Sequence, residues 1–207
     1  MNNIYFITGI GTEVGKTMIS AIVTEALEAD YFKPVQAGDL DNSDTDKVRA
    51  LISNTKSKFH KNAFALKTPM SPHAAAAIDK IEIKREDIKR PQTENHLVIE
   101  GAGGLLVPLN SKDCIIDLLE PSDRIILVSR HYLGSINHTL LSVEALKNRG
   151  FKNIGLIFSG DKHSTTEQII LEKTQLPLIG RIQEENEFSK DVISKHAKAI
   201  KSKLKEI

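Results

Sequence analysis

The sequence predicts an α/β fold in which a mostly parallel central sheet lies between layers of helices. Six short apolar runs, rich in Ile, Val and Phe, recur along the 207 residues, and longer helical patterns separate them. Runs without polar alternation are typical of strands that are buried on both faces. Because strands and helices alternate, we expect the strands to be parallel. The predicted strands are 3–8, 31–35, 96–100, 124–129, 153–159 and 178–181.

Composition limits the class of protein. Lys and Arg number 28 against 27 Asp and Glu, and this balance argues against a protein that coats nucleic acid or an anionic membrane. The single cysteine, Cys114, excludes an intramolecular disulfide framework and is expected to be a small buried residue. No apolar run approaches the roughly 20 residues of a membrane-spanning helix, and the start MNNIYFIT lacks the features of a signal peptide. We expect one cytoplasmic domain over residues 1–207.

The first predicted strand runs directly into a phosphate-binding loop. Gly9 ends the strand, and Gly15-Lys16-Thr17 opens the helix that follows. Glycines let backbone N–H groups turn toward phosphate oxygens, and the helix N-terminus adds its dipole. We expect Lys16 to reach the β- and γ-phosphates and the Thr17 hydroxyl to bind magnesium. The glycine spacing is one residue longer than the standard pattern, but the strand and helix around the loop indicate a three-layer sandwich of the P-loop NTPase type.

The second predicted strand ends at Lys33, and an acidic stretch follows. Pro34 restricts Lys33 to an extended conformation, which is expected to send its side chain out beyond the sheet. There Lys33 is either a solvated surface residue or, as the phosphate loop favours, a second cation for the transferring phosphoryl group. The stretch lacks the glycine of a calcium-binding EF-hand loop, so we expect one or two of its carboxylates to hold magnesium and the rest to cap helices or face solvent. These residues are Asp39, Asp41, Asp44 and Asp46.

The third predicted strand ends on Glu100, and Gly101-Ala102-Gly103-Gly104 follows. A structural carboxylate rarely ends a buried strand without a partner. An acid at the end of an apolar strand beside a phosphate loop is the Walker-B arrangement for metal binding. The glycines after it allow a ligand to approach the backbone closely. Between the second and third strands, short helical pieces are expected to decorate the sheet.

Two longer helices are predicted in the second half of the chain. Gly150 is expected to end the first of them, 135–149. The second, 189–207, also carries several lysines, which we expect to form a solvated face because no Trp or Phe lies opposite. The apolar positions at helical spacing are Ile136, Leu140, Val143 and Leu146 in the first helix, and Ile193, Ala197, Ile200, Leu204 and Ile207 in the second.

Taken in order, these motifs resemble those of the dethiobiotin synthetase family. The phosphate loop has the family's Thr12-Glu13-Val14-Gly15-Lys16-Thr17 core and its long glycine spacing, and Lys33-Pro34-Val35 resembles the segment of the catalytic lysine. Other matching segments are Asn42-Ser43-Asp44, Ser71-Pro72-His73, Glu100-Gly101-Ala102-Gly103-Gly104 and Leu133-Gly134-Ser135-Ile136-Asn137-His138. The last of these resembles a segment that helps to close the substrate site across a homodimer interface.

The resemblance implies a ligase of biotin biosynthesis. Its reaction is the ATP-dependent carboxylation and ring closure of 7,8-diaminopelargonate (7,8-diaminononanoate) with CO2 to dethiobiotin, via a carbamate and a carbamic–phosphoric anhydride. The partners implied are these small molecules, Mg2+, ATP as co-substrate and a second copy of the chain, with no nucleic acid and no membrane. Lys33 and Lys16 would be catalytic, and Thr17, Asp44 and Glu100 would hold the metal.

The resemblance and the motif positions together give a predicted set of binding residues. The nucleotide is expected to contact Thr12, Glu13, Val14, Gly15, Lys16, Thr17, Met18, Asp44, Glu100, Gly101, Ala102, Gly103, Ser159 and Gln183. The substrate is expected to contact Thr12, Lys33, Ala37, Ser71, Gly134 and Asn137, with His73 in a positioning or structural role.

Two positions depart from the family pattern. Ala37 stands where the family commonly has Ser or Thr in contact with the substrate, so one hydrogen bond is in doubt. Ser159-Gly160 stands where relatives often have Asn-Asp, which contacts adenine. The amide of Gln183 is a candidate to compensate, and the preferred base stays open.

Two other classes of protein share the phosphate loop and stay open at this point. A partitioning-type P-loop ATPase carries a signature lysine five residues before the conserved one. Gly11 occupies that position here, which counts against this class. A cobyrinate-type amide ligase usually carries a glutaminase domain, for which 207 residues leave no room. A pure nucleotide-binding module is the least favoured, because it would leave Lys33 and Glu100 without a task.

Overall fold

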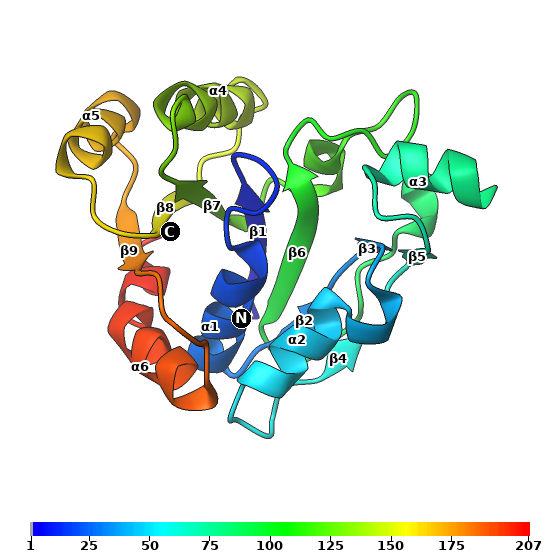
Figure 1. Ribbon diagram of the computed structural model, residues 1–207, viewed down its shortest axis with the longest axis horizontal. Coiled ribbons are helices and arrows are strands. Elements are labelled where there is room, and N and C mark those ends of the chain that lie inside the picture. Colours follow the sequence, from blue (N-terminus) through cyan, green and yellow to red (C-terminus); the bar gives the residue numbers. More distant parts are fainter. Residues whose placement is uncertain (1) are drawn as a thin grey trace.

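The computed structural model describes residues 2–207 and confirms the α/β class. Seven strands form the main sheet in the order β4-β2-β6-β1-β7-β8-β9, and all neighbouring pairs are parallel. Helices lie on both faces of this sheet, which gives the predicted three layers (Figure 1). The strands are β1 Ile4–Gly9, β2 Asp30–Phe32, β4 Phe59–His60, β6 Leu97–Gly104, β7 Arg124–Arg130, β8 Ile154–Ser159 and β9 Leu178–Ile182.

The order of the strands explains which helices share a face. The chain leaves β1 in one direction toward β2, and leaves β7 in the other direction toward β8 and β9. Right-handed crossovers therefore place α1 on one face and α4 and α5 on the other. Helix α1 packs against α2 and α6, while α4 packs against α5 (Figure 1). The helices are α1 Lys16–Leu27, α2 Asp44–Leu51, α3 Pro72–Asp79, α4 Ser135–Asn148, α5 Ser164–Thr174 and α6 Lys190–Ile200.

The central strands are buried on both faces, as their lack of polar alternation predicts. Neighbouring residues of β1, Phe6 and Ile7, are both fully buried, yet they belong to two different apolar clusters. Successive side chains of a strand point to opposite faces, so each cluster fills one side of the sheet. The apolar side chains of α6, among them Ile193 and Ile200, are buried against the first cluster.

Pro34 divides the predicted strand 31–35 into two. Strand β2 ends at Phe32 in the main sheet, while β3 (Val35–Ala37) pairs with β5 (Phe64–Leu66) in a separate two-stranded sheet. Proline has no N–H to donate, so it interrupts the hydrogen-bond ladder. Its carbonyl accepts from the backbone of Ala63 and Phe64 and so begins the second sheet. The prediction of one continuous strand was wrong for this reason.

Other predicted boundaries also differ from the structure. Strand β6 continues past Glu100 to Gly104, because Gly104 still pairs with Gly9 of β1. The predicted helix 189–207 ends at Ile200 and is followed by a short 3-10 turn, Lys203–Lys205. Cys114 is only half buried, which corrects the expectation of a buried residue. Helix α4 ends at Asn148, and Gly150 follows with the positive φ expected of a helix end.

A search for membrane spans among residues 2–207 finds no helix with the length and apolar character that crossing a bilayer would need.

Candidate active site

A cleft of about 750 Å³ opens where the central strands end. In parallel sheets this edge is the usual position of a ligand site. Most of the predicted binding residues line this cleft, although they come from widely separated parts of the chain. Those that line it are Thr12, Glu13, Gly15, Lys16, Thr17, Met18, Lys33, Ala37, Asp44, Ser71, Glu100, Ala102 and Gly103.

The phosphate loop is shaped by two glycines that no other residue could replace without strain. A Cβ on Gly9 would lie 2.5 Å from a methyl group of Val14. Gly15 has a φ of +92°, and a Cβ on it would lie 2.7 Å from Oγ of Ser159. Helix α1 begins at the next residue, Lys16, so its free N–H groups face the cleft at this point.

Lys16 lies almost buried beside this loop. Its Nζ donates to the backbone oxygen of Gly11 at 2.8 Å, and the residue is 7% exposed. Burial, and then the positive charge of Lys33, lower the pKa of Lys16 to about 8. An anionic ligand at the loop would counter both effects and favour the charged form of this lysine.

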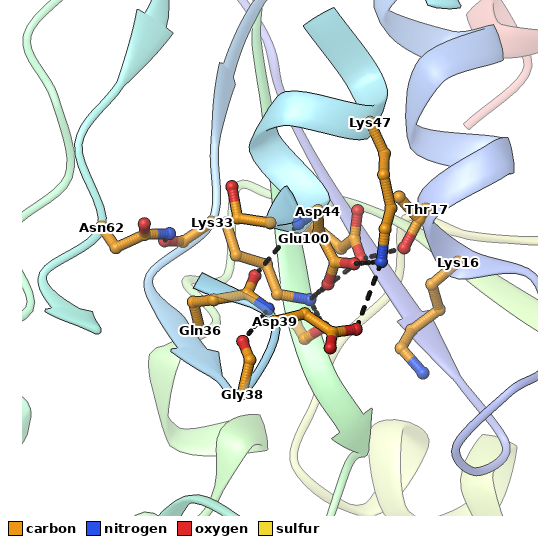
Figure 2. A network of polar contacts seen from close by, with 12 residues as sticks. Lys16, Thr17, Lys33, Gln36, Gly38, Asp39, Asp44, Lys47, Asn62 and Glu100 are labelled. Carbon is orange, nitrogen blue, oxygen red and sulfur yellow. Dashed lines mark hydrogen bonds and ion pairs between the residues drawn. The ribbon is translucent and has the colours of Figure 1, made fainter. Parts of the chain in front are cut away.

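Lys33 lies at the centre of a buried ion cluster. Its Nζ is 2.8 Å from Oδ2 of Asp44, 2.9 Å from Oε1 of Glu100 and 3.2 Å from the oxygen of Gly101 (Figure 2). The residue is 4% exposed, so the alternative of a solvated surface lysine is wrong. Burial alone would lower the pKa of Lys33, but Glu100 and Asp44 raise it, so this ammonium keeps its charge.

Glu100 connects the cluster to the phosphate loop. Its Oε1 accepts from Thr17 Oγ1 at 3.0 Å as well as from Lys33, and its Oε2 accepts from the hydroxyl of Tyr31 at 2.9 Å. Burial, and then Glu100, raise the pKa of Tyr31 well above its usual value, so the phenol remains a donor. Sequence reasoning missed Tyr31, because within an apolar strand it resembles a core residue.

Asp44 is placed by the start of helix α2. The Ser43 side chain caps this helix by accepting from the N–H of Asp46 at 3.2 Å, and Asp46 bonds back to the backbone of Ser43. The N–H of Asp44 donates to the side-chain oxygen of Gln36 at 3.3 Å. Burial alone would raise the pKa of Asp44, but the ammonium of Lys33 lowers it, so Asp44 is a carboxylate.

The donor set suits a magnesium ion. Thr17, Asp44 and Glu100 bring a hydroxyl and two carboxylates to one part of the cleft, and the Thr17 hydroxyl donates to Glu100. Magnesium prefers such hard oxygen ligands, and it commonly takes one or two carboxylates together with phosphate oxygens and water. No group of three or more His, Cys, Asp or Glu side chains gathers within residues 2–207, so phosphate oxygens would have to complete the coordination here.

A second, smaller cavity of about 250 Å³ adjoins the phosphate loop. Ser159 and Gly160 line it, and the closeness of Ser159 to Gly15 places it beside the loop. Arg130 lines both cavities and is paired with Glu184, another lining residue of the smaller one. Sequence reasoning missed Arg130 and Glu184, since charged residues at strand ends are common on protein surfaces.

Five predicted binding residues line neither cavity: Val14, Gly101, Gly134, Asn137 and Gln183. Val14 and Gly101 are adjacent in sequence to residues that line the main cleft, and Val14 is buried. Gly134 and Asn137 are exposed at the beginning of α4, and Gln183 is exposed after β9. Their assigned roles stay predictions.

Comparison with known proteins identifies the family. A family model described as an AAA domain matches residues 3–191. A relative from Christiangramia forsetii, named ATP-dependent dethiobiotin synthetase BioD, is 63% identical over 98% of this chain and 98% of its own length. This chain belongs to the dethiobiotin synthetase family. Relatives of the same name from Cytophaga hutchinsonii and Chlamydia pneumoniae are 47% and 43% identical, over 93% and 92% of the chain and 94% and 86% of their own lengths.

Solved structures outside the dethiobiotin synthetases share the fold. A putative plasmid partition protein from Borrelia burgdorferi, bound to AMPPNP, has a TM-score of 0.60 at 14% identity and covers 100% of both chains. A ParA family ATPase from Chlorobium tepidum has a TM-score of 0.55 at 14% identity, over 100% of this chain and 93% of its own. At such identity the likeness concerns the fold alone. It confirms the P-loop NTPase type, while the family membership decides against a partitioning ATPase or an amide ligase.

The carboxylate of Glu100 gives a prediction about magnesium. Glu100→Gln keeps the shape of the side chain but removes a ligand charge, so the magnesium concentration for half-maximal activity should rise about tenfold or more. Titration of activity against magnesium measures this shift. Asp41→Asn, on an exposed residue outside the cleft, is the matched control and should leave the curve unchanged. An unchanged curve for Glu100→Gln would mean that Glu100 has only a structural role.

Proposed function

We propose that this chain makes dethiobiotin from 7,8-diaminopelargonate, carbon dioxide and ATP in the cleft between the phosphate loop and Lys33. Dethiobiotin synthetases use ATP and carbon dioxide to close a ring on diaminopelargonate, which is a step of biotin biosynthesis. Because the chain belongs to this family, it is an ATP-dependent cyclo-ligase. One observation carries the assignment of residues. The ammonium of Lys33 is buried beside Glu100, which contacts Thr17 of the phosphate loop.

The chemistry needs no covalent attachment to the protein. One amine of the substrate adds carbon dioxide and loses a proton, which gives a carbamate. A carbamate oxygen attacks the γ-phosphorus of ATP and displaces ADP, so that a carbamic–phosphoric anhydride forms. The second amine attacks the carbonyl carbon, expels phosphate and closes a five-membered cyclic urea. Each step requires the positioning of groups that are otherwise held apart by charge and by entropy.

Cations are the main catalytic need of this scheme, because carbamate and triphosphate are both anionic. Lys16 belongs to the phosphate loop and Lys33 lines the same cleft, so negative charge that develops near both would be stabilised by two ammonium groups. Thr17, Asp44 and Glu100 are the residues that would hold magnesium, which when bound supplies positive charge to the phosphates. Asp44 and Glu100 also fix the position of Lys33 before any ligand arrives.

The part of the cleft lined by β3 and the beginning of α3 is suited to the alkyl part of the substrate. Val35, Ala37, Met70 and Pro72 supply an apolar surface there, and Ser71 supplies a hydroxyl. The side chain of Ala37 has no hydrogen-bonding atom, so at this position it would hold the substrate by van der Waals contact only. His73 lies next to Ser71, at 3.2 Å from Oγ to Nδ1, and fits a positioning role.

The activity assay tests the proposal directly. Incubation with ATP, magnesium, bicarbonate and diaminopelargonate should yield dethiobiotin, detected by mass spectrometry, in amounts equal to the ADP released. Lys16→Ala and Lys33→Ala should each lower the rate by at least about 100-fold, the scale of losing one preorganised donor. Lys61→Ala, outside the cleft, serves as the control. Near-normal turnover by Lys33→Ala would remove its catalytic assignment, and no dethiobiotin from the unaltered chain would refute the function.

A homodimer is the second part of the proposal. Leu133 is fully exposed, and Tyr132 and Leu141 are 42% and 54% exposed, so an apolar surface surrounds the beginning of α4. Gly134 and Asn137 lie on the same segment outside the cleft, where they could contact the substrate of a second copy. A cytoplasmic location, and independence from nucleic acid and membranes, stay predictions.

Light scattering should show a species of twice the 22.9 kDa chain mass. Leu133→Asp should shift it toward monomer, because a charge replaces an exposed apolar side chain at the interface. The same variant should raise KM for diaminopelargonate and leave ADP binding unchanged. A monomer with full activity would contradict the dimer.

The base of the nucleotide is proposed to lie in the smaller cavity. Ser159 offers one short hydroxyl and Gly160 no side chain, where an amide could otherwise make two hydrogen bonds to adenine. GTP or CTP should therefore support turnover within about tenfold of ATP, the effect of roughly one neutral hydrogen bond. Parallel assays with four nucleoside triphosphates measure this ratio. A preference for ATP of several hundredfold would contradict the prediction. Arg130 and Glu184 would then be the first candidates to contact the base, since they line the smaller cavity and Gln183 lines neither cavity.

A further inference from the structure

Lys47 is a cation of the cleft that the proposed mechanism does not use. It lies on α2 and lines the main cleft. Its Nζ is 3.8 Å from Oδ1 of Asp44, while Lys33 contacts the other oxygen of the same carboxylate at 2.8 Å. Asp44 is therefore placed between two lysines, one buried and one partly exposed (Figure 2).

The two lysines differ in how far their hydrogen-bonding capacity is used. Lys33 makes three polar contacts at 2.8–3.2 Å. Lys47, within residues 2–207, makes one hydrogen bond, to Oδ2 of Asp39 at 3.5 Å, which is the long end of the range. An ammonium has three N–H donors, so most of the capacity of Lys47 remains for a ligand.

The position of Lys47 is fixed by the helix on which it lies. The Ser43 cap sets the first turn of α2, and Lys47 follows Asp44 by three residues, so both side chains lie on the same face of the helix. Thr17, the phosphate-loop residue next to Lys16, donates to Glu100, which Lys33 joins to Asp44. Thr17, Asp44 and Lys47 line the same cleft. Lys47 therefore stands beside the end of the loop where the terminal phosphate of a nucleotide would lie.

The partner that holds Lys47 is a weak competitor for this charge. The side chain of Asp39 is 73% exposed, and that of Lys47 is 32% exposed. An ion pair between solvated groups contributes little, since water and salt screen it. A phosphate group with more than one negative charge would replace Asp39 at small cost.

We propose that Lys47 binds the γ-phosphate of ATP and is a third cation of the phosphoryl transfer. This rests on the proposed function, in which a carbamate oxygen attacks that phosphate. Lys16 approaches the phosphate from the loop and Lys33 from the side of the carbamate, while Lys47 approaches from α2. The three ammonium groups then surround the phosphoryl oxygens on which negative charge is greatest during transfer.

The test compares nucleotides with and without a γ-phosphate. Lys47→Met keeps the length of the side chain and removes its charge, so the Kd for the β,γ-imido analogue of ATP should rise about tenfold, the low end for a hydrogen bond to a charged group. The Kd for ADP should not change. Lys47→Arg should restore most of the affinity for the analogue, and calorimetry with and without magnesium gives all these values.

Arg49→Ala is the matched control, because Arg49 lies on the same helix but contacts Asp46 and the ring of Phe59 outside the cleft. It should leave both Kd values unchanged. Thermal unfolding of each variant confirms that the helix is retained. Lys47→Met should also lower kcat, by about tenfold or more, with little change in KM for diaminopelargonate.

Three outcomes would overturn the proposal: equal affinity of Lys47→Met and the unaltered chain for the analogue, an equal loss for ADP, or a loss seen only in the presence of magnesium. The last would mean that Lys47 acts through Asp44 on the metal and does not touch phosphate. The binding ratio is independent of turnover, so it still tests Lys47 if the unaltered chain makes no dethiobiotin. Absence of dethiobiotin from the unaltered chain would refute the proposed function but not the binding role of Lys47.

Discussion

The buried ion cluster of Lys33, Asp44 and Glu100 is the constraint on which the rest of the site depends. A lysine removed from water is tolerated only when carboxylates compensate its charge, and here two of them do so at 2.8 and 2.9 Å. The cluster joins the residue after β2 and the first turn of α2 to β6, which lies more than fifty residues further along the chain. Through Thr17 it also joins the phosphate loop, so the nucleotide side and the substrate side of the cleft share one set of charges.

The parallel topology brings this cluster together. Strands β2 and β1 flank β6, so the residues that follow these strands meet at one edge of the sheet. Glu100 is placed by the hydrogen-bond ladder of β6, whereas Asp44 is placed by the cap of α2 and by Gln36. A strand and a helix N-terminus therefore each supply one carboxylate to Lys33.

Much of this arrangement could be predicted from the sequence, because strong local signals carried it. The phosphate loop, Lys33 and Glu100 stand out as glycine or charge at the ends of apolar runs. Asp44 was singled out from its acidic stretch only by the resemblance to the family. The structure places all of these residues in one cleft. Tyr31 and Lys47 carry no such signal, since a tyrosine in a strand and a lysine in a helix are ordinary there. The short strands β4 and β5 were not predicted either, because their pairing depends on distant parts of the chain.

The interruption at Pro34 has a consequence for how such an enzyme can change over time. It separates the small sheet of β3 and β5, which carries Val35 and Ala37, from the main sheet that supports the phosphate loop. Substitutions in the small sheet can therefore alter which molecule fits against it without disturbing the register of the central strands. Gln36 of the same strand is the exception, because its side chain accepts from the backbone of Asp44. Ala37 makes no such contact, so a change of its side chain would reshape the substrate wall and leave the ion cluster in place.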